Sequence, residues 1–183
     1  TTLEAKEQFH LSMTVAYAVV DALESYTDGF SIKWPNDIYW KDKKIGGILI
    51  ENELEGKFLS QSIVGIGINV NQEVFHSSAP NPVSLIQIIG ASIDRKELLN
   101  KILRGIMSGY IFLETAYRQA VLNISQLYTQ KLYRNEGFHP YRDKEGTFWA
   151  EFQQVEPSGH LILKDKQDKL RRYAFKEVEF ILP

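Results

Sequence analysis

The chain has 183 residues, with 21 basic and 23 acidic side chains and a formal net charge of −2 at pH 7. This length can bury a core for one domain with a small appendage, and the balanced charge gives no electrostatic case for binding nucleic acid or an anionic membrane surface. The absence of cysteine excludes disulfides and cysteine metal sites. No apolar run approaches the roughly 20 residues that span a bilayer, and the first residues lack signal-peptide character, so a soluble cytoplasmic protein is expected.

The hydrophobic pattern predicts an α+β chain. Apolar residues three to four positions apart indicate helices, and β-rich stretches bounded by glycine, proline and charged turns indicate strands. The predicted elements are a helix over 5–25, short strands over 30–33 and 38–40, a hairpin of 45–53 with 58–69, a loop over 70–82, a short helix over 83–89, a long helix capped by Asp94, and another short helix over 125–134 after a break near Asn123.

Beyond Gly137 the pattern becomes β. Strands are expected over 147–155, 160–164 and 171–182, between turns rich in glycine and aspartate. This switch of period predicts a boundary, with residues 1–136 forming the main domain and residues 137–183 a small barrel-like one.

The most informative segment runs from Lys33 to Asp37 and reads Lys-Trp-Pro-Asn-Asp. Proline fixes its own φ and biases the residue before it towards extended geometry, so Asn36 and Asp37 are predicted just beyond a strand, facing a cleft. An amide there could read an adenine edge. Structural roles are the alternative: Lys33 as a solvated strand end, Trp34 as a core plug, and Asp37 as a cap of the next turn.

Lys44 is the second candidate. Its neighbours Lys41 and Lys43 in the same charged turn are predicted to be solvated. Lys44 differs because it lies just before Gly46 and Gly47, where the missing Cβ atoms let a ligand or another chain approach the backbone. A lysine ammonium there would stabilise the negative charge that develops as a carboxylate becomes an acyl phosphate.

The sequence lacks the motifs of several common enzyme and cofactor-binding classes. The segment from Gly65 to Gly67 superficially matches the start of a dinucleotide-binding fingerprint, but Val70 replaces the third glycine and no helix is predicted to follow. We interpret it as a tight strand ending at Asn69 and Asn71, whose amides could point into a cleft. Walker, Gly-x-Ser-x-Gly and paired-histidine motifs are missing, and the four histidines are too scattered for a metal site, so no protein-held metal is expected.

Three blocks together resemble the biotin protein ligases: Lys33 to Asp37, Lys44 to Glu51, and Gly65 to Asn71. The resemblance implies a class II synthetase-like fold, with a mixed or antiparallel sheet, flanking helices and a small SH3-like β-barrel after them. It also implies a biotin-[acetyl-CoA-carboxylase] ligase, which uses ATP to form biotinyl-5'-AMP and transfers biotin to a lysine of a biotin carboxyl carrier domain. Mg²⁺ would enter with the ATP phosphates.

The same resemblance assigns roles to individual residues. Those assigned are Lys44 and Asp37 as catalytic residues, Lys44, Gly46 and Gly47 at biotin, and Asn36 and Asn69 at the nucleotide. Trp34 would pack beneath the site. A homodimer is a further expectation.

One departure from the family concerns the glycine- and arginine-rich loop that folds over biotin and adenylate. It normally lies upstream of the helix that here starts near Ala5, and no such sequence is present. The chain is therefore expected to be the carboxyl-terminal part of a ligase, poorly active and dimeric or aggregation-prone by itself. The alternatives are a non-catalytic biotin-binding or dimerising fragment, and a lipoate ligase, which would not be expected to carry the Lys33 to Asp37 block.

Overall fold

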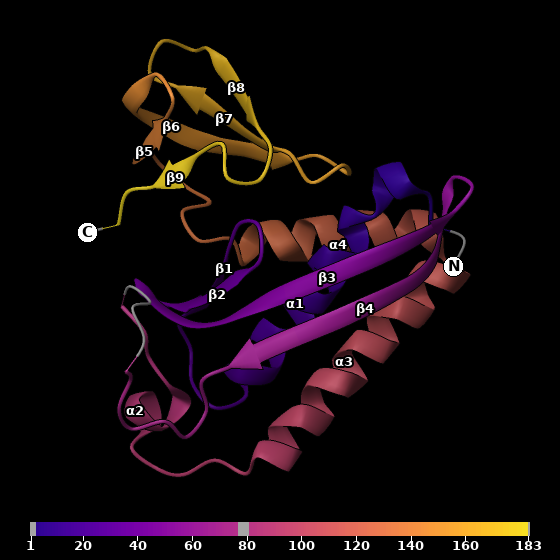
Figure 1. Ribbon diagram of the computed structural model, residues 1–183, viewed down its shortest axis with the longest axis vertical. Helices are drawn as coiled ribbons and strands as arrows, with labels where there is room; N and C mark the ends of the chain where they lie inside the picture. Colours follow the sequence, from indigo (N-terminus) through magenta and orange to yellow (C-terminus); the bar gives the residue numbers. More distant parts are fainter. Residues whose placement is uncertain (1–2, 77–80, 183) are drawn as a thin grey trace.

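The computed structural model describes residues 3–76 and 81–182. These residues form a four-stranded sheet, a five-stranded sheet and flanking helices (Figure 1), so the predicted α+β class is confirmed. We call the region up to the end of the last helix, at Gln130, the first part. Its elements are a short 3₁₀ turn at Ala5–Glu7, α1 (Phe9–Glu24), β1 (Phe30–Lys33), β2 (Asp37–Trp40), β3 (Lys43–Glu55), β4 (Phe58–Ile68), α2 (Leu85–Ile89), α3 (Arg95–Thr115) and α4 (Tyr117–Gln130). Of the predicted loop over 70–82, residues 77–80 lie outside the described residues.

The first sheet is an antiparallel meander in the order β1-β2-β3-β4. The predicted hairpin is confirmed, since β3 and β4 pair from Gly46 opposite Ile68 to Glu55 opposite Phe58. Strands β1 and β2 form a shorter hairpin, closed by Lys33 opposite Asp37. The peptide bond between Trp34 and Pro35 in this turn is cis. The sequence motif therefore forms the tip of a hairpin.

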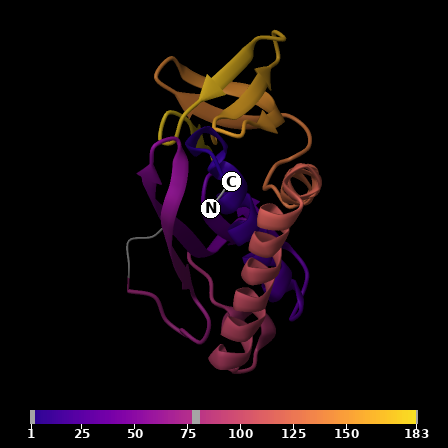
Figure 2. The same cartoon turned by 90° about the vertical axis from the view of Figure 1, so that its right-hand side faces the viewer.

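Helix α1 forms the centre of the first part. Side chains around almost its whole circumference are buried, as expected for a helix covered on several sides. Figure 2 shows the sheet and α3 in separate layers, with α1 between them. On α3, a Cβ added at Gly105 would lie 3.0 Å from Ala18 Cβ, and one at Gly109 would lie 2.5 Å from Thr14 Cγ2, so these glycines let the two helices pack closely.

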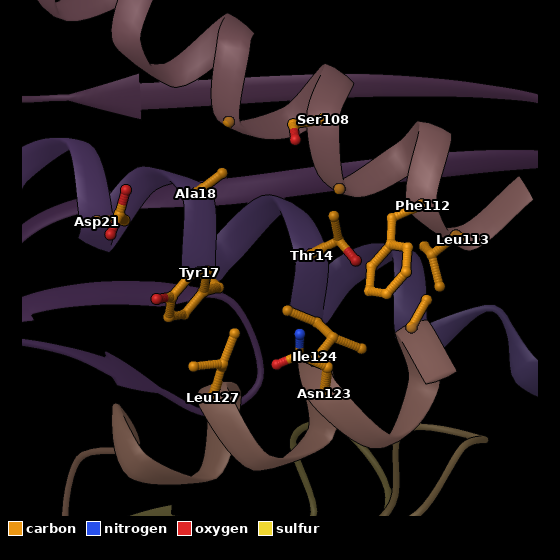
Figure 3. Close-up of a pocket in the computed structure, with 13 residues that line it drawn as sticks. Thr14, Tyr17, Ala18, Asp21, Ser108, Phe112, Leu113, Asn123, Ile124 and Leu127 are labelled. Carbon is orange, nitrogen blue, oxygen red and sulfur yellow. The ribbon is translucent and has the colours of Figure 1, made fainter. Parts of the chain in front are cut away.

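A cavity of about 240 Å³ lies where α1, α3 and α4 meet. Figure 3 shows its lining of mostly apolar side chains from the three helices, with Asp21 and Asn123 among the polar ones. None of the sequence-predicted site residues lines it. Among the described helices, none combines the length and apolar character needed to cross a bilayer.

The predicted helix boundary near Asn123 is wrong. The break between α3 and α4 falls at Ala116, which has φ −141° and ψ 47°, and α4 runs through Asn123 without interruption. Ala120, Ile124 and Tyr128 lie four residues apart and are all buried. Packing of this face stabilises the helix through a residue of low helix propensity, which tertiary contacts commonly override.

The second sheet is also antiparallel, in the order β8-β7-β6-β5-β9. Its strands are β5 (His139–Asp143), β6 (Gly146–Val155), β7 (Leu161–Asp165), β8 (Leu170–Tyr173) and β9 (Glu179–Phe180). The single strand predicted over 171–182 is thus two strands separated by a turn over 174–178. The division of the chain into domains at residue 137 stays a prediction.

The second sheet contacts the first part beside the β1–β2 hairpin (Figure 1). Trp34, which is 3% exposed, donates from its indole Nε1 to the carbonyl oxygen of Gly159 at 3.0 Å. The backbone N–H of Phe9 donates to the carbonyl oxygen of Pro157 at 3.3 Å. Trp34 is therefore a core residue that joins the two sheets, as its structural interpretation predicted.

Candidate functional site

Asp37 lies between two lysines at the start of β2. Its Oδ1 accepts a hydrogen bond from the Lys44 ammonium, and its Oδ2 lies 3.8 Å from Lys33 Nζ. Two ammonium groups therefore share one carboxylate. All three side chains are partly buried, with Lys33 18% exposed and Lys44 34% exposed. The structure brings the two predicted catalytic residues, Lys44 and Asp37, into contact, and their catalytic role stays a prediction. Lys33 was not assigned to this site.

A bulge in β3 positions Lys44. Tyr39 pairs with Lys44 and Ile38 with Gly46, which leaves Ile45 as the extra residue. Bulges change the direction of neighbouring side chains and are frequent beside functional sites. The Lys44 backbone is also held by residues 81–83, because its N–H donates to the carbonyl of Asn81 and its carbonyl accepts from the N–H of Val83, both at 2.9 Å. The bulge and these bonds together direct Lys44 towards Asp37.

Burial lowers the pKa of Lys33 because the charged form loses hydration. Asp37 opposes this effect, whereas the positive charges of Lys44 and Arg134 add to it. The Lys33 ammonium lies 5.1 Å from the ring centroid of Phe180 and 5.3 Å from that of Tyr39, whose own pKa burial raises to about 12. The Lys33 ammonium is thus held in partly apolar surroundings, next to two aromatic rings.

Lys44 lines two cavities. We call the first the glycine cavity; its volume is about 420 Å³ and its described lining is Lys44, Gly46, Gly47, Gly67, Ile68, Asn69, Gln72, Phe75 and Pro82. We call the second the inter-sheet cleft; its volume is about 370 Å³ and its lining is Lys33, Trp34, Pro35, Asn36, Asp37, Lys44, Phe175, Lys176, Val178 and Phe180.

The two predicted glycines face different surroundings. A Cβ at Gly46 would lie 2.4 Å from the carbonyl oxygen of Gly67, so β4 requires this glycine for packing. A Cβ at Gly47 would meet nothing closer than Asp37 Oδ1 at 3.4 Å. Gly47 pairs with both Asp37 and Gly67 and shares their face of the sheet. A Cβ at Gly67 would also meet almost nothing, so this face is an open backbone surface beside Lys44.

Both predicted nucleotide-side amides are partly used within the fold. Asn36 Nδ2 donates to the carbonyl of Ile48 at 2.7 Å, and Asn69 Nδ2 donates to the carbonyl of Val83 at 3.2 Å. Asn36 lines the inter-sheet cleft and Asn69 the glycine cavity. The idea that Asn71 faces the cleft is wrong, since its amide binds the backbone N–H and carbonyl of Ile93.

Sequence reasoning missed the contribution of the carboxyl-terminal sheet. Phe175, Lys176 and Val178 come from the turn between β8 and β9, and Phe180 from β9, yet all four line a cavity with the β1–β2 hairpin. No local pattern relates residues some 140 positions apart. Lys176 itself carries no distinguishing signal, because Arg171, Arg172, Glu177 and Glu179 lie in the same segment.

Comparisons with known proteins point to the class of biotin and lipoate protein ligases. Residues 2–69 match the model of the biotin/lipoate A/B protein ligase family. The bifunctional ligase/repressor BirA of Bacillus subtilis is 31% identical over 173 residues, which cover 90% of this chain and 51% of that protein. The chain thus spans about half the length of the curated relatives it matches.

Solved structures agree with the sequence matches. The apo biotin protein ligase of Aquifex aeolicus superposes with a TM-score of 0.74 at 25% identity, covering 99% of this chain and 80% of that one. The same ligase in complex with biotin and ATP gives a TM-score of 0.74 at 26% identity, covering 99% and 76%. Together these matches support membership of this chain in the biotin protein ligase family.

Proposed function

We propose that the protein carrying these 183 residues activates biotin with ATP and transfers it to a lysine of a biotin carboxyl carrier domain. The observation that supports this proposal most is the position of Lys44. Its ammonium contacts Asp37, it lies beside the open glycine face of β3 and β4, and it lines two cavities. A reaction that joins two substrates at a phosphorus atom needs a cation at their meeting point.

In the first step, a carboxylate oxygen of biotin attacks the α-phosphorus of ATP. A new P–O bond forms, the bond from phosphorus to the bridging oxygen breaks, and pyrophosphate leaves with the electron pair. Negative charge grows on the phosphate oxygens in the transition state, where the Lys44 ammonium stabilises it. Asp37 holds that ammonium in place through its hydrogen bond. Most of the catalysis assigned to this chain is therefore positioning and charge stabilisation.

In the second step, the neutral amine of a carrier lysine attacks the acyl carbon of biotinyl-5'-AMP. The C–N bond forms, the C–O bond to AMP breaks, AMP leaves with the electron pair, and the nitrogen loses a proton to water. The carrier lysine must reach the acyl group from outside, so this group has to lie at an open surface. The glycine face around Gly47 and Gly67 meets that requirement.

The shape of the site suggests where each substrate group binds. The planar ureido ring of biotin suits the face around Gly47, where a Cβ would otherwise project. The side-chain nitrogens of Asn36 and Asn69 already donate to backbone carbonyls, so each amide offers its Oδ1 as an acceptor. An acceptor matches the amino group of adenine. These two residues are therefore proposed to contact the nucleotide through their side-chain oxygens.

Mg²⁺ fits the site only as a partner of the nucleotide. Among the described residues no three histidine or acidic side chains lie close enough together to hold a metal ion. Asp37 is the one carboxylate among the residues that line the two cavities. Mg²⁺ needs few protein carboxylates because it keeps water and phosphate ligands. When bound, it would neutralise phosphate charge.

Transfer to a carrier domain tests this function. The protein at its native length is incubated with biotin, ATP, Mg²⁺ and a biotin carboxyl carrier domain, and carrier mass is measured. We expect the mass to increase by one biotinyl group, and lipoate in place of biotin to give no product. A cytoplasmic location and homodimerisation remain parts of the proposal. Binding of biotin by a folded protein that forms no adenylate would instead favour a non-catalytic biotin-binding role.

A further inference from the structure

The cavity where α1, α3 and α4 meet, which we call the three-helix cavity, is separate from the candidate site. None of its described lining residues lines the glycine cavity or the inter-sheet cleft. Its floor is apolar and buried, since Ala18, Leu113 and Ala120 are 5%, 4% and 2% exposed. Its volume of about 240 Å³ exceeds the roughly 150 Å³ of a protein cavity that holds benzene. The three-helix cavity therefore has room for a small organic molecule.

The sequence of two helices produces this cavity. Residues of α1 three or four positions apart, from Thr14 to Asp21, line one wall of it, because such residues share one face of a helix. The facing wall comes from small residues of α3, namely Gly105, Ser108 and Gly109. Small side chains on α3 thus leave open a space that larger ones would fill.

Several polar side chains around the cavity have no partner within residues 3–76 and 81–182. They are Tyr17 and Asp21 of α1, Ser108 of α3 and Asn123 of α4, none of which forms a side-chain hydrogen bond or an ion pair there. Figure 3 shows the amide of Asn123 pointing from α4 towards α1. The apolar floor is therefore combined with unused hydrogen-bonding groups, a combination typical of small-molecule sites.

The charge at the cavity is negative. Asp21 is the one charged side chain among the described lining residues. Burial and the charge of Asp21 raise the pKa of Tyr17, so its hydroxyl stays protonated and neutral. Lys131, whose charge also acts on Tyr17, is bound to both carboxylate oxygens of Glu24, at 2.8 and 2.7 Å. The carboxylate of Asp21 is thus left for a cation from outside the fold.

We propose that the three-helix cavity binds a small apolar amine in its protonated form, with the ammonium at Asp21 and the apolar body on the buried floor. An ammonium donates up to three hydrogen bonds, and the Asp21 carboxylate, the Tyr17 hydroxyl and the Asn123 side-chain oxygen are acceptors for them. The rings of Tyr17 and Phe112 suit an aromatic or cationic ligand. A carboxylate ligand would instead be repelled by Asp21. This binding site lies beyond the proposed ligase chemistry and does not depend on it.

The test uses three probes with the same phenyl-ethyl skeleton: phenethylamine, which is protonated at neutral pH, phenethyl alcohol, which is neutral, and hydrocinnamate, which is an anion. Their affinities for the protein at its native length are measured by titration calorimetry without biotin or ATP. Thermal denaturation confirms that each variant is folded. A bound amine should also raise the melting temperature, because it contacts three helices that separate on unfolding.

Three variants locate the site. Asp21→Asn removes the charge with little change of shape, and Asp28→Asn is its matched control, since Asp28 is also exposed but does not line the cavity. Ser108→Leu places a larger side chain at the cavity from an exposed position of α3, which the fold should tolerate.

We expect the wild-type protein to bind phenethylamine about tenfold more tightly than phenethyl alcohol, and hydrocinnamate most weakly. Asp21→Asn should weaken amine binding by about tenfold and leave alcohol binding unchanged. Asp28→Asn should change neither affinity, whereas Ser108→Leu should weaken both.

Four outcomes overturn the amine site. They are no detectable binding of phenethylamine, equal wild-type affinities for the amine and the alcohol, wild-type amine affinity in folded Asp21→Asn, and unchanged amine affinity in folded Ser108→Leu. The last of these would show that the amine binds elsewhere. Because no biotin, ATP or turnover is involved, none of these results depends on whether the proposed ligase function is correct.

Discussion

Two charge clusters in this molecule differ in how their charges are balanced. At the inter-sheet cleft, Lys33 and Lys44 share the single carboxylate of Asp37. In the carboxyl-terminal sheet one guanidinium, that of Arg171, meets three carboxylates. These are Asp165 at 2.9 Å, Asp143 at 3.2 Å and Glu145 at 3.3 Å.

The carboxylates of the second cluster are well supplied with donors. Asp165, only 2% exposed, also accepts from the backbone N–H groups of Gln167 and Lys169. Asp143 also accepts from the Tyr173 hydroxyl at 2.6 Å and the N–H of Glu145. A network with its hydrogen bonds satisfied stabilises a fold, whereas a cluster short of anions beside a cavity is suited to a charged ligand. Charge balance, more than charge itself, therefore separates the two roles.

The largest effect should follow from removing the cation at the centre of the site. We predict that Lys44→Ala slows formation of biotinyl-5'-AMP by about 10²- to 10³-fold, as expected when one preorganised charge is lost from a transition state. The rate is measured in a single turnover with the protein at its native length. Stability should change little, because Lys44 is only partly buried.

Lys43→Ala is the control for that experiment, since Lys43 is exposed and precedes Lys44 in the same strand. It should react at the wild-type rate. A folded Lys44→Ala protein with a near wild-type rate would show that Lys44 takes no part in the mechanism. The cluster around Asp37 would then have no functional role to set against the structural role of the Arg171 cluster.

Breaking the second cluster should affect stability and leave binding unchanged. We predict that Arg171→Met lowers the free energy of unfolding by about 3 kcal/mol, because it leaves carboxylates without their cation. Urea denaturation measures the loss. Affinity for ATP should stay unchanged at temperatures where the variant is folded. Unaltered stability, or a selective loss of ATP binding, would contradict the structural role.

Alanine substitutions at the two adjacent glycines of β3 should also have separate effects, one on biotin binding and the other on stability. Gly47→Ala adds a methyl group that the fold tolerates, at 3.4 Å from Asp37 Oδ1, but that occupies the face assigned to biotin. We predict about tenfold weaker biotin binding with nearly unchanged stability. Gly46→Ala should instead cost about 2 kcal/mol of stability, because its Cβ would lie 2.4 Å from Gly67 O.

Calorimetric titration with biotin and urea denaturation of both glycine variants check this pair of expectations. The interpretation fails if Gly47→Ala binds biotin as tightly as the wild-type protein does, or if Gly46→Ala is as stable as wild type.

The smallest predicted effect is a dependence of stability on pH. Hydrogen bonds from Arg171 lower the pKa of Asp165, and for Asp143 the bonds from Tyr173, Glu145 N–H and Arg171 outweigh burial, which acts to raise its pKa. A lowered pKa in the folded state gives stability that is present above the unfolded value, near 3.8, and is lost as pH falls through the folded value.

Arg171→Met should therefore flatten the acid limb of the stability curve below about pH 4. Urea denaturation at a series of pH values between about 2 and 6 would measure this. Parallel curves for wild type and variant would show that Arg171 does not set these carboxylate pKa values.

Local signals were sufficient to predict most elements of the fold. The hairpin of β3 with β4 follows from two β-rich stretches around Gly56, and the cap of α3 from Asp94, whose side chain accepts from the N–H groups of Lys96 and Glu97. The break between α3 and α4 could not be predicted, because Ala116 carries no breaking signal and the packing of Ile124 and Tyr128 keeps α4 helical through Asn123.

Sequence analysis could predict those residues of the candidate site that lie close together in the chain. Asp37 and Lys44 are seven residues apart on neighbouring strands, and the resemblance to a family pointed to both. Lys33 could have been added, since it pairs with Asp37 across a short hairpin. Lys176 could not, because its place in the cleft depends on the docking of the second sheet, through contacts such as that of Trp34 with Gly159.

Adenylate formation by this protein is best measured by exchange of radioactive pyrophosphate into ATP, because the exchange reports reversible formation of an adenylate and requires no carrier. The protein at its native length is incubated with ATP, Mg²⁺ and labelled pyrophosphate, with and without biotin. The account predicts exchange that requires biotin, is not supported by lipoate, and is lost in Lys44→Ala while Arg171→Met retains it. Exchange that is independent of biotin, or that persists at the wild-type rate in Lys44→Ala, would contradict it.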